Sequence, residues 1–102
     1  MLRFRPGYWL LPSTDRLVLA EGTPIDIPNL SDFEYHETVK TLCNIHNEGV
    51  IHNDIKPENI LVKRHGNMCE VRIIDFAPSE RSENIGRVRK EMVYLERMLE
   101  IY

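Results

Sequence analysis

Residues 50–62 read Val-Ile-His-Asn-Asp-Ile-Lys-Pro-Glu-Asn-Ile-Leu-Val, a polar cluster held between two apolar segments. The cluster contains His52, Asp54, Lys56 and Asn59. Because apolar residues stand on both sides, we expect a rigid loop whose ends are anchored in a core. Phosphoryl transfer uses such a set, since a carboxylate meets the attacking hydroxyl, a cation meets the phosphate and a neutral oxygen helps to hold a metal ion.

A second polar element follows an apolar run further along the chain. Residues 71–77 read Val-Arg-Ile-Ile-Asp-Phe-Ala, a strand-like segment that ends at Asp75. The gap between Asn59 and Asp75 suits one short β-hairpin, with Gly66-Asn67 near its tip. The spacing therefore predicts one hairpin between the two polar elements.

The first stretch resembles the catalytic loop of protein kinases, H-R-D-x-x-x-x-N, and its Lys-Pro-Glu-Asn segment resembles the serine/threonine-specific branch. Asp-Phe-Ala at 75–77 resembles the D-F-G element of the same family. The resemblance implies an α+β fold with a β-hairpin, a supporting helix, the catalytic loop with its short hairpin, and a C-terminal helix. It also implies that residues 1–102 are a partial kinase-like domain: the end of the small lobe, the hinge and the start of the large lobe.

The same resemblance implies a role for each polar side chain. Asp54 would accept the proton of the substrate hydroxyl, and Lys56 would neutralise charge on the phosphate transferred from ATP. Asn59 and Asp75 would bind Mg²⁺ beneath the nucleotide. His52 would support the loop under Asp75. Taken alone, each of these charged residues could instead be an ordinary solvent-exposed loop residue without a catalytic role.

The N-terminal region contains two strand-like runs, at residues 8–11 and 16–20, separated by the turn-forming residues Pro-Ser-Thr-Asp. They predict a β-hairpin. By resemblance, it corresponds to the fourth and fifth strands of the small kinase lobe, which would place Leu19 at the back of the adenine pocket and Glu21 in the hinge. An unrelated short hairpin is the alternative.

Two helices are predicted. Residues 31–34 read Ser-Asp-Phe-Glu, a capping-box pattern that begins a helix over about 32–48, with Gly49 beyond its last turn. One stripe of this helix should face the core: Tyr35, Val39, Leu42, Cys43 and His46. Residues 85–102 carry apolar side chains at 3-4-3-4-3 spacing: Ile85, Val88, Met92, Leu95, Leu99 and Tyr102. This seam predicts a helix packed on the core, with a partner helix as the alternative.

Four potential zinc ligands are present, namely Cys43, His46, His52 and Cys69. A core-facing role for the helix residues is favoured, because structural zinc sites usually contain two close ligand pairs. Two cysteines in 102 residues suggest a reducing environment, so we expect an intracellular, cytoplasmic protein. The net charge of −3 and the absence of a long apolar run argue against nucleic acid and membrane as partners.

Several features depart from the kinase pattern. Lys40 is the first lysine of the chain, so no strand lysine precedes it to hold the ATP phosphates, and no glycine-rich loop is visible. Asn53 stands where the motif has Arg, and Ala77 where it has Gly. Two functions remain open: phosphoryl transfer from ATP to protein serine or threonine by a truncated kinase-like domain, or a non-catalytic, pseudokinase-like module that regulates a partner protein. A piece of a longer kinase gene is a third interpretation, and we expect ATP to bind where the pocket is completed.

Overall fold

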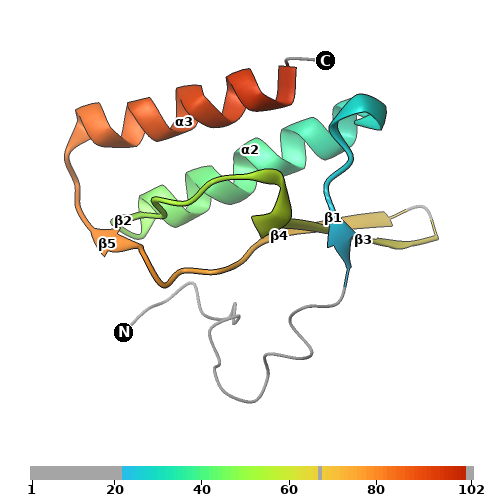
Figure 1. Cartoon of the computed structure of the whole chain (residues 1–102), viewed down its shortest axis with the longest axis horizontal. Helices are drawn as coiled ribbons and strands as arrows, with labels where there is room; N and C mark the ends of the chain where they lie inside the picture. Colours follow the sequence, from blue (N-terminus) through green and yellow to red (C-terminus); the bar gives the residue numbers. More distant parts are fainter. Residues whose placement is uncertain (1–21, 67, 101–102) are drawn as a thin grey trace.

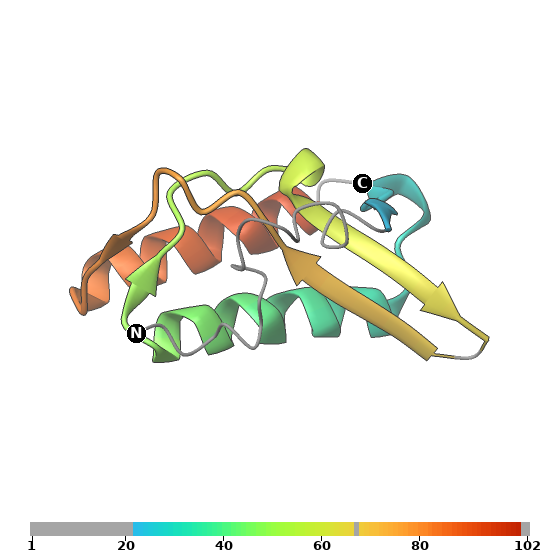
Figure 2. The ribbon, with the colours of Figure 1, turned by 90° about the horizontal axis from the view of Figure 1, so that it is seen from below.

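The computed structural model describes residues 22–66 and 68–100. Within this part, two helices lie side by side and two small antiparallel β-structures occupy opposite ends of the molecule (Figures 1 and 2). The α+β expectation is confirmed. The hairpin predicted at residues 8–20 lies outside the described residues, as do Leu19 and Glu21. In chain order the elements are β1 (Thr23–Pro24), η1 (Ile27–Asn29), α2 (Asp32–Asn47), β2 (Val50–Ile51), η2 (Pro57–Asn59), β3 (Ile60–His65), β4 (Met68–Ile73), β5 (Glu80–Arg81) and α3 (Ile85–Glu100).

The predicted hairpin between the two motifs is present as β3 and β4. The strands pair from Ile60 opposite Ile73 to the turn, where Gly66 has a φ of +60°. Glycine adopts this left-handed conformation without the penalty that a Cβ imposes. Ile60 and Ile73 are both fully buried, so the end of the hairpin next to the polar loop is anchored in the core.

The N-terminus of α2 confirms the predicted capping box. The Glu34 amide donates to Ser31 Oγ at 3.0 Å, and the Ser31 amide donates to Glu34 Oε1 at 3.4 Å. The helix ends at Asn47, and Gly49 follows with a φ of +81°. Two local signals in the sequence therefore fix both ends of the helix that supports the loop.

The core-facing side of α2 was predicted correctly for Leu42, which is fully buried, and wrongly for Cys43, which is exposed. The buried face is centred on Thr38, Leu42 and Ile45. Each residue turns the helix by about 100°, so Cys43 lies on the side of Leu42 that points away from Ile45. The polar Thr38 belongs to the buried face because its hydroxyl donates to the Glu34 carbonyl at 2.7 Å.

The seam of α3 packs on the core through its C-terminal half. Leu95 and Leu99 are buried, Met92 is partly buried against the same cluster, and Ile85 at the first turn is 71% exposed. Tyr102, the last member of the predicted seam, lies outside the described residues. No helix in the described part of the chain is both long and apolar enough to cross a bilayer.

Leu42→Ala should lower the free energy of unfolding by about 2–5 kcal/mol, the range for truncating a buried leucine. Urea denaturation followed by circular dichroism would measure the change. Cys43→Ala is the matched control, since its side chain is exposed on the next position of the same helix. If the two variants unfold at the same urea concentration, the assigned orientation of α2 is wrong.

Candidate active site

The polar loop runs from His52 to η2, and His52 connects it to the segment before Asp75. The His52 ring is fully buried. Its Nε2 lies 2.8 Å from the Ile74 carbonyl oxygen, and its Nδ1 accepts from the Asp54 amide at 3.1 Å. The ring also packs edge-on against Phe76, with centroids 4.7 Å apart. Both hydrogen bonds require the neutral tautomer with its proton on Nε2, because a carbonyl only accepts and an amide N–H only donates.

Burial lowers the pKa of His52 below its ordinary value, and this outweighs the opposing effects of the Ile74 carbonyl and of Glu91, Asp54 and Asp75 nearby. The shift agrees with the hydrogen bonds, since a proton on Nδ1 would face the Asp54 amide. His52 therefore holds the backbone of Asp54 most firmly in its uncharged form.

Asp54, Lys56 and Asn59 meet around one carboxylate. The Asn59 side-chain amide donates to the Asp54 carbonyl oxygen at 2.8 Å and to Asp54 Oδ2 at 3.1 Å. The Lys56 ammonium nitrogen lies 3.9 Å from the same Oδ2. About a third of the Asp54 side chain is exposed, while Asn59 is buried. The loop thus exposes the Asp54 carboxylate to solvent, and the neutral side-chain amide of the buried Asn59 holds it in place.

Asp75 lies two residues after the end of β4, where the chain runs beside Asn59 at the end of η2. The Ile74 amide donates to the Asn59 carbonyl at 2.9 Å, which places Asp75 one residue beyond that bond. Asp75 is exposed and has a φ of +66°, and Asn53 before the loop aspartate has a φ of +72°. Asn and Asp adopt this conformation more readily than most residues. The sequence-predicted loop residues and Asp75 therefore come from two adjacent segments joined by His52 and Asn59.

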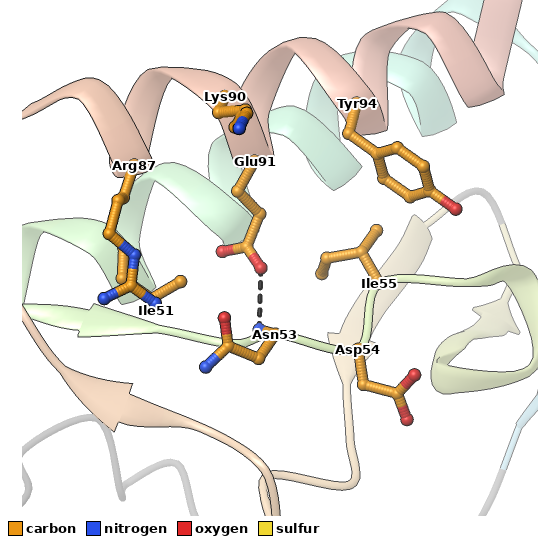
Figure 3. A pocket seen from close by; sticks show the side chains of 8 residues that line it. All are labelled: Ile51, Asn53, Asp54, Ile55, Arg87, Lys90, Glu91 and Tyr94. Atoms are coloured by element: carbon orange, nitrogen blue, oxygen red, sulfur yellow. Dashed lines mark hydrogen bonds between the residues drawn. The ribbon is translucent and has the colours of Figure 1, made fainter.

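Glu91 on α3 is the residue that the sequence analysis missed. Its carboxylate accepts from the His52 amide at 3.1 Å and lies 2.7 Å from His46 Nε2 on α2. It also accepts from the Asn53 amide at 2.7 Å (Figure 3). Glu91 stands three residues after Val88 and four before Leu95, a core-facing position of the apolar seam. An acidic residue at such a position was the available signal, because buried carboxylates need partners.

Burial alone raises the pKa of Glu91, but hydrogen bonds from His46, Asn53 and His52 together bring it below its ordinary value. The carboxylate is therefore ionised at neutral pH. A charged acceptor makes stronger hydrogen bonds with amides than a neutral one. Glu91 thus attaches the loop backbone to α3 by two charge-assisted bonds.

Asn53 connects the loop to the segment that follows Asp75. Its side-chain amide donates to the Pro78 carbonyl at 2.9 Å and to Glu80 Oε2 at 3.1 Å, and Glu80 forms an ion pair with Arg87. The bonds from Arg87 and Asn53 lower the pKa of Glu80. Behind them, β2 and β5 pair through Val50 opposite Arg81. Contacts with the loop, with β2 and with α3 therefore hold this short segment in place.

The cysteines lie apart from this site. Cys43 is exposed and Cys69 is partly buried, and burial raises the pKa of the Cys69 thiol. Between Gly22 and Glu100, leaving out residue 67, no group of three or more His, Cys, Asp or Glu side chains is placed to hold a metal ion.

Comparison with known proteins gives one consistent family. The model of the protein kinase domain matches residues 17–96. The chain is 36% identical over 89 residues to the serine/threonine-protein kinase ppk34 of Schizosaccharomyces pombe, covering 87% of this chain and 23% of that protein. It is 41% identical over 64 residues to the mitogen-activated protein kinase p38a of Drosophila melanogaster, covering 59% and 17%. The chain therefore spans less than a quarter of the length of these relatives. No solved structure matches.

Glu91→Gln should lower the free energy of unfolding by about 1–3 kcal/mol, because the amide cannot accept from both backbone N–H groups as the carboxylate does. Hydrogen exchange at the His52 and Asn53 amides should become faster than in the parent. Glu96→Gln on the same helix is the control. Unchanged exchange at both amides in Glu91→Gln would contradict the assigned contacts.

Stability should fall as the pH drops below about 6.5, the unfolded-state pKa of histidine, towards the lowered folded-state pKa of His52. The sign follows because the unfolded chain binds the proton and the folded chain resists it. Urea denaturation at pH 7.5 and 5.5 would measure the loss. His52→Gln, which keeps a donor and an acceptor but does not titrate, should show a smaller difference between the two pH values. An equal difference would assign the pH dependence to other groups.

Proposed function

Because the chain belongs to the protein kinase family, we propose that its loop serves ATP-dependent phosphoryl transfer to serine or threonine side chains of proteins. The observation that carries the proposal is the meeting of Asp54, Lys56 and Asn59, with the lysine ammonium 3.9 Å and the asparagine amide 3.1 Å from one carboxylate oxygen. A solvated loop would leave these side chains separate. Here the carboxylate is both held and accessible.

The proposed chemistry assigns one step to each group. The partly exposed Asp54 carboxylate accepts the proton of the substrate hydroxyl while the hydroxyl oxygen attacks the γ-phosphorus of ATP and the bond to ADP breaks. The Lys56 ammonium, half exposed beside Asp54, meets the negative charge of the transferred group. His52 and Glu91 act through the backbone, by holding Asp54 in place.

Asn59 and Asp75 are the proposed ligands for Mg²⁺. Asn59 directs its NH₂ group at Asp54, so its carbonyl oxygen remains available as a ligand. In the described part of the chain, the exposed Asp75 carboxylate has no ion-pair partner. Mg²⁺ commonly takes one or two carboxylates together with water and substrate phosphates, so this pair fits the ion. When bound, the ion supplies charge neutralisation at the phosphates.

The nucleotide pocket needs more than the loop. We assign residues 1–102 to the end of the small lobe, the hinge and the start of the large lobe, with Leu19 and Glu21 as the adenine-side residues. The groups that hold the α- and β-phosphates would come from further polypeptide, within a longer protein or from a partner. This proposal implies an intracellular protein, where ATP is available, and weak nucleotide binding by the 102 residues alone.

A second candidate function is a non-catalytic kinase-like module that binds and regulates a partner protein. The observation in its favour is that Lys40, the first lysine of the chain, lies on α2. Residues 1–39 thus offer no lysine to the ATP phosphates. Retention of Asp54, Lys56, Asn59 and Asp75 together favours phosphoryl transfer, because partner binding alone does not require that set.

Transfer of labelled phosphate from ATP to a serine peptide, measured with the chain alone and with candidate partner chains, tests the proposal. Asp54→Asn should reduce the rate about 10²–10⁴-fold at every Mg²⁺ concentration, because it removes the proton acceptor. Asp75→Asn should instead recover part of its activity at high Mg²⁺, because it weakens metal binding. Equal rates for Asp54→Asn and the parent would exclude the mechanism. A parent that binds a partner without any transfer would favour the second candidate.

A further inference from the structure

A cavity of about 510 Å³ lies between the catalytic loop and α3 (Figure 3). Arg87, Lys90, Glu91 and Tyr94 line it from the helix, and Asp54 lies at its loop side. Asp54, the residue to which the proposed function assigns the substrate hydroxyl, therefore forms part of the cavity wall, while its carboxylate points away from α3. A peptide whose hydroxyl lies at Asp54 can extend a neighbouring side chain into the cavity.

The loop side of the cavity exposes little apolar surface. Ile51 and Ile55 line it from the loop, but they are only 2% and 6% exposed. A ligand that covers their remaining exposed surface would gain little binding free energy, since the hydrophobic contribution scales with the apolar area removed from water. The exposed apolar lining is therefore on the helix side, where Tyr94 is 57% exposed, and the charged groups decide which charge the cavity accepts.

The available polar groups on the helix side are donors. Lys90 is exposed and has no ion pair or hydrogen bond with any residue of 22–66 or 68–100. Tyr94 is 57% exposed and its hydroxyl is likewise unpaired within those ranges. Arg87 is bound on one side by Glu80 but is still partly exposed. An ammonium, a phenol and a guanidinium together favour an anionic group.

The two carboxylates of the cavity do not cancel this preference. Glu91 is nearly buried, and its charge is directed at the His52 and Asn53 amides and at His46. The Asp54 carboxylate points away from α3 in Figure 3 and is bonded to Asn59. An anion beside Lys90 would thus face the donors of the helix, while each acid is already bound elsewhere.

We propose that this cavity binds an anionic side chain, a carboxylate or a phosphate, of a peptide whose serine or threonine hydroxyl lies at Asp54. The inference rests on the proposed function, because it names the class of substrate for the same loop. Lys90 would be the main specificity-determining residue, with Arg87 and Tyr94 beside it. Peptides with an acidic or phosphorylated residue near the acceptor would be preferred over neutral ones.

Binding of fluorescein-labelled peptides to the full chain, measured by anisotropy without ATP, tests this inference separately from catalysis. The peptides carry a central serine in an otherwise neutral sequence, with glutamate, phosphoserine or glutamine placed in turn at each of the three positions on either side. At the best position, the glutamate or phosphoserine peptide should bind about fivefold more tightly than the glutamine peptide, as expected for one partly exposed ion pair. Comparing the affinities of the glutamate and phosphoserine peptides shows whether the cavity prefers a carboxylate or a phosphate.

Lys90→Glu and Lys90→Ala should remove the preference for the anion. Arg89→Glu is the matched control, since it makes the same charge change at the next exposed position of α3 without lining the cavity. Circular dichroism would show that each variant is folded. Equal loss in Arg89→Glu and Lys90→Glu, or equal binding of charged and glutamine peptides to the parent, would overturn the inference. Anion-selective binding by a chain that transfers no phosphate, even with a partner that supplies the groups for the α- and β-phosphates, would refute the proposed catalysis alone. Transfer without selectivity would refute the cavity assignment alone.

Discussion

The carboxylate of Glu91 is the interaction on which the loop depends. It accepts from the His52 and Asn53 amides, two consecutive backbone groups that belong to no strand or helix of their own. A buried amide without a partner destabilises the folded chain by about 1–3 kcal/mol, so the amide of the buried His52 needs an acceptor. On an open surface, water would accept these hydrogen bonds. Here a charge from α3, 38 or 39 residues away in the chain, takes its place and makes the path of the loop a consequence of helix packing.

The same carboxylate also joins the two helices. His46 on α2 lies 2.7 Å from Glu91 Oε1, so the supporting helix, the C-terminal helix and the loop share one polar centre within a largely apolar core. The other ring nitrogen of His46 is buried and has no hydrogen bond among the described residues. This unpaired atom opposes stability, whereas the bond through Nε2 favours it. The arrangement fixes orientation, because an apolar residue at position 91 could pack there in several ways without directing the two amides.

Local patterns in the sequence predicted where helices, strands and turns lie. They could not predict which residues far apart in the chain contact each other. The capping box of Ser31 and Glu34, the turn at Gly66 and the end of α2 near Gly49 each depend on residues close together in the chain, and each was predicted. The motif likewise indicated that Asp54 and Asn59 act together. Cys43 was misplaced because a list of apolar positions does not say where the centre of the buried face lies. Glu91 was missed because its partners are known only once α3 is packed.

Asn53 shows how a departure from a family pattern is compensated in the fold. The family motif has an arginine at this position, and this chain has Asn53 instead. In the structure, the short amide of Asn53 reaches the Pro78 carbonyl and Glu80 directly, and Arg87 neutralises Glu80 from α3. A cationic residue is therefore still present, but it is Arg87 of the C-terminal helix α3, and it pairs with Glu80. Because Arg87 also lines the cavity, the same ion pair positions one side of the cavity beside Lys90.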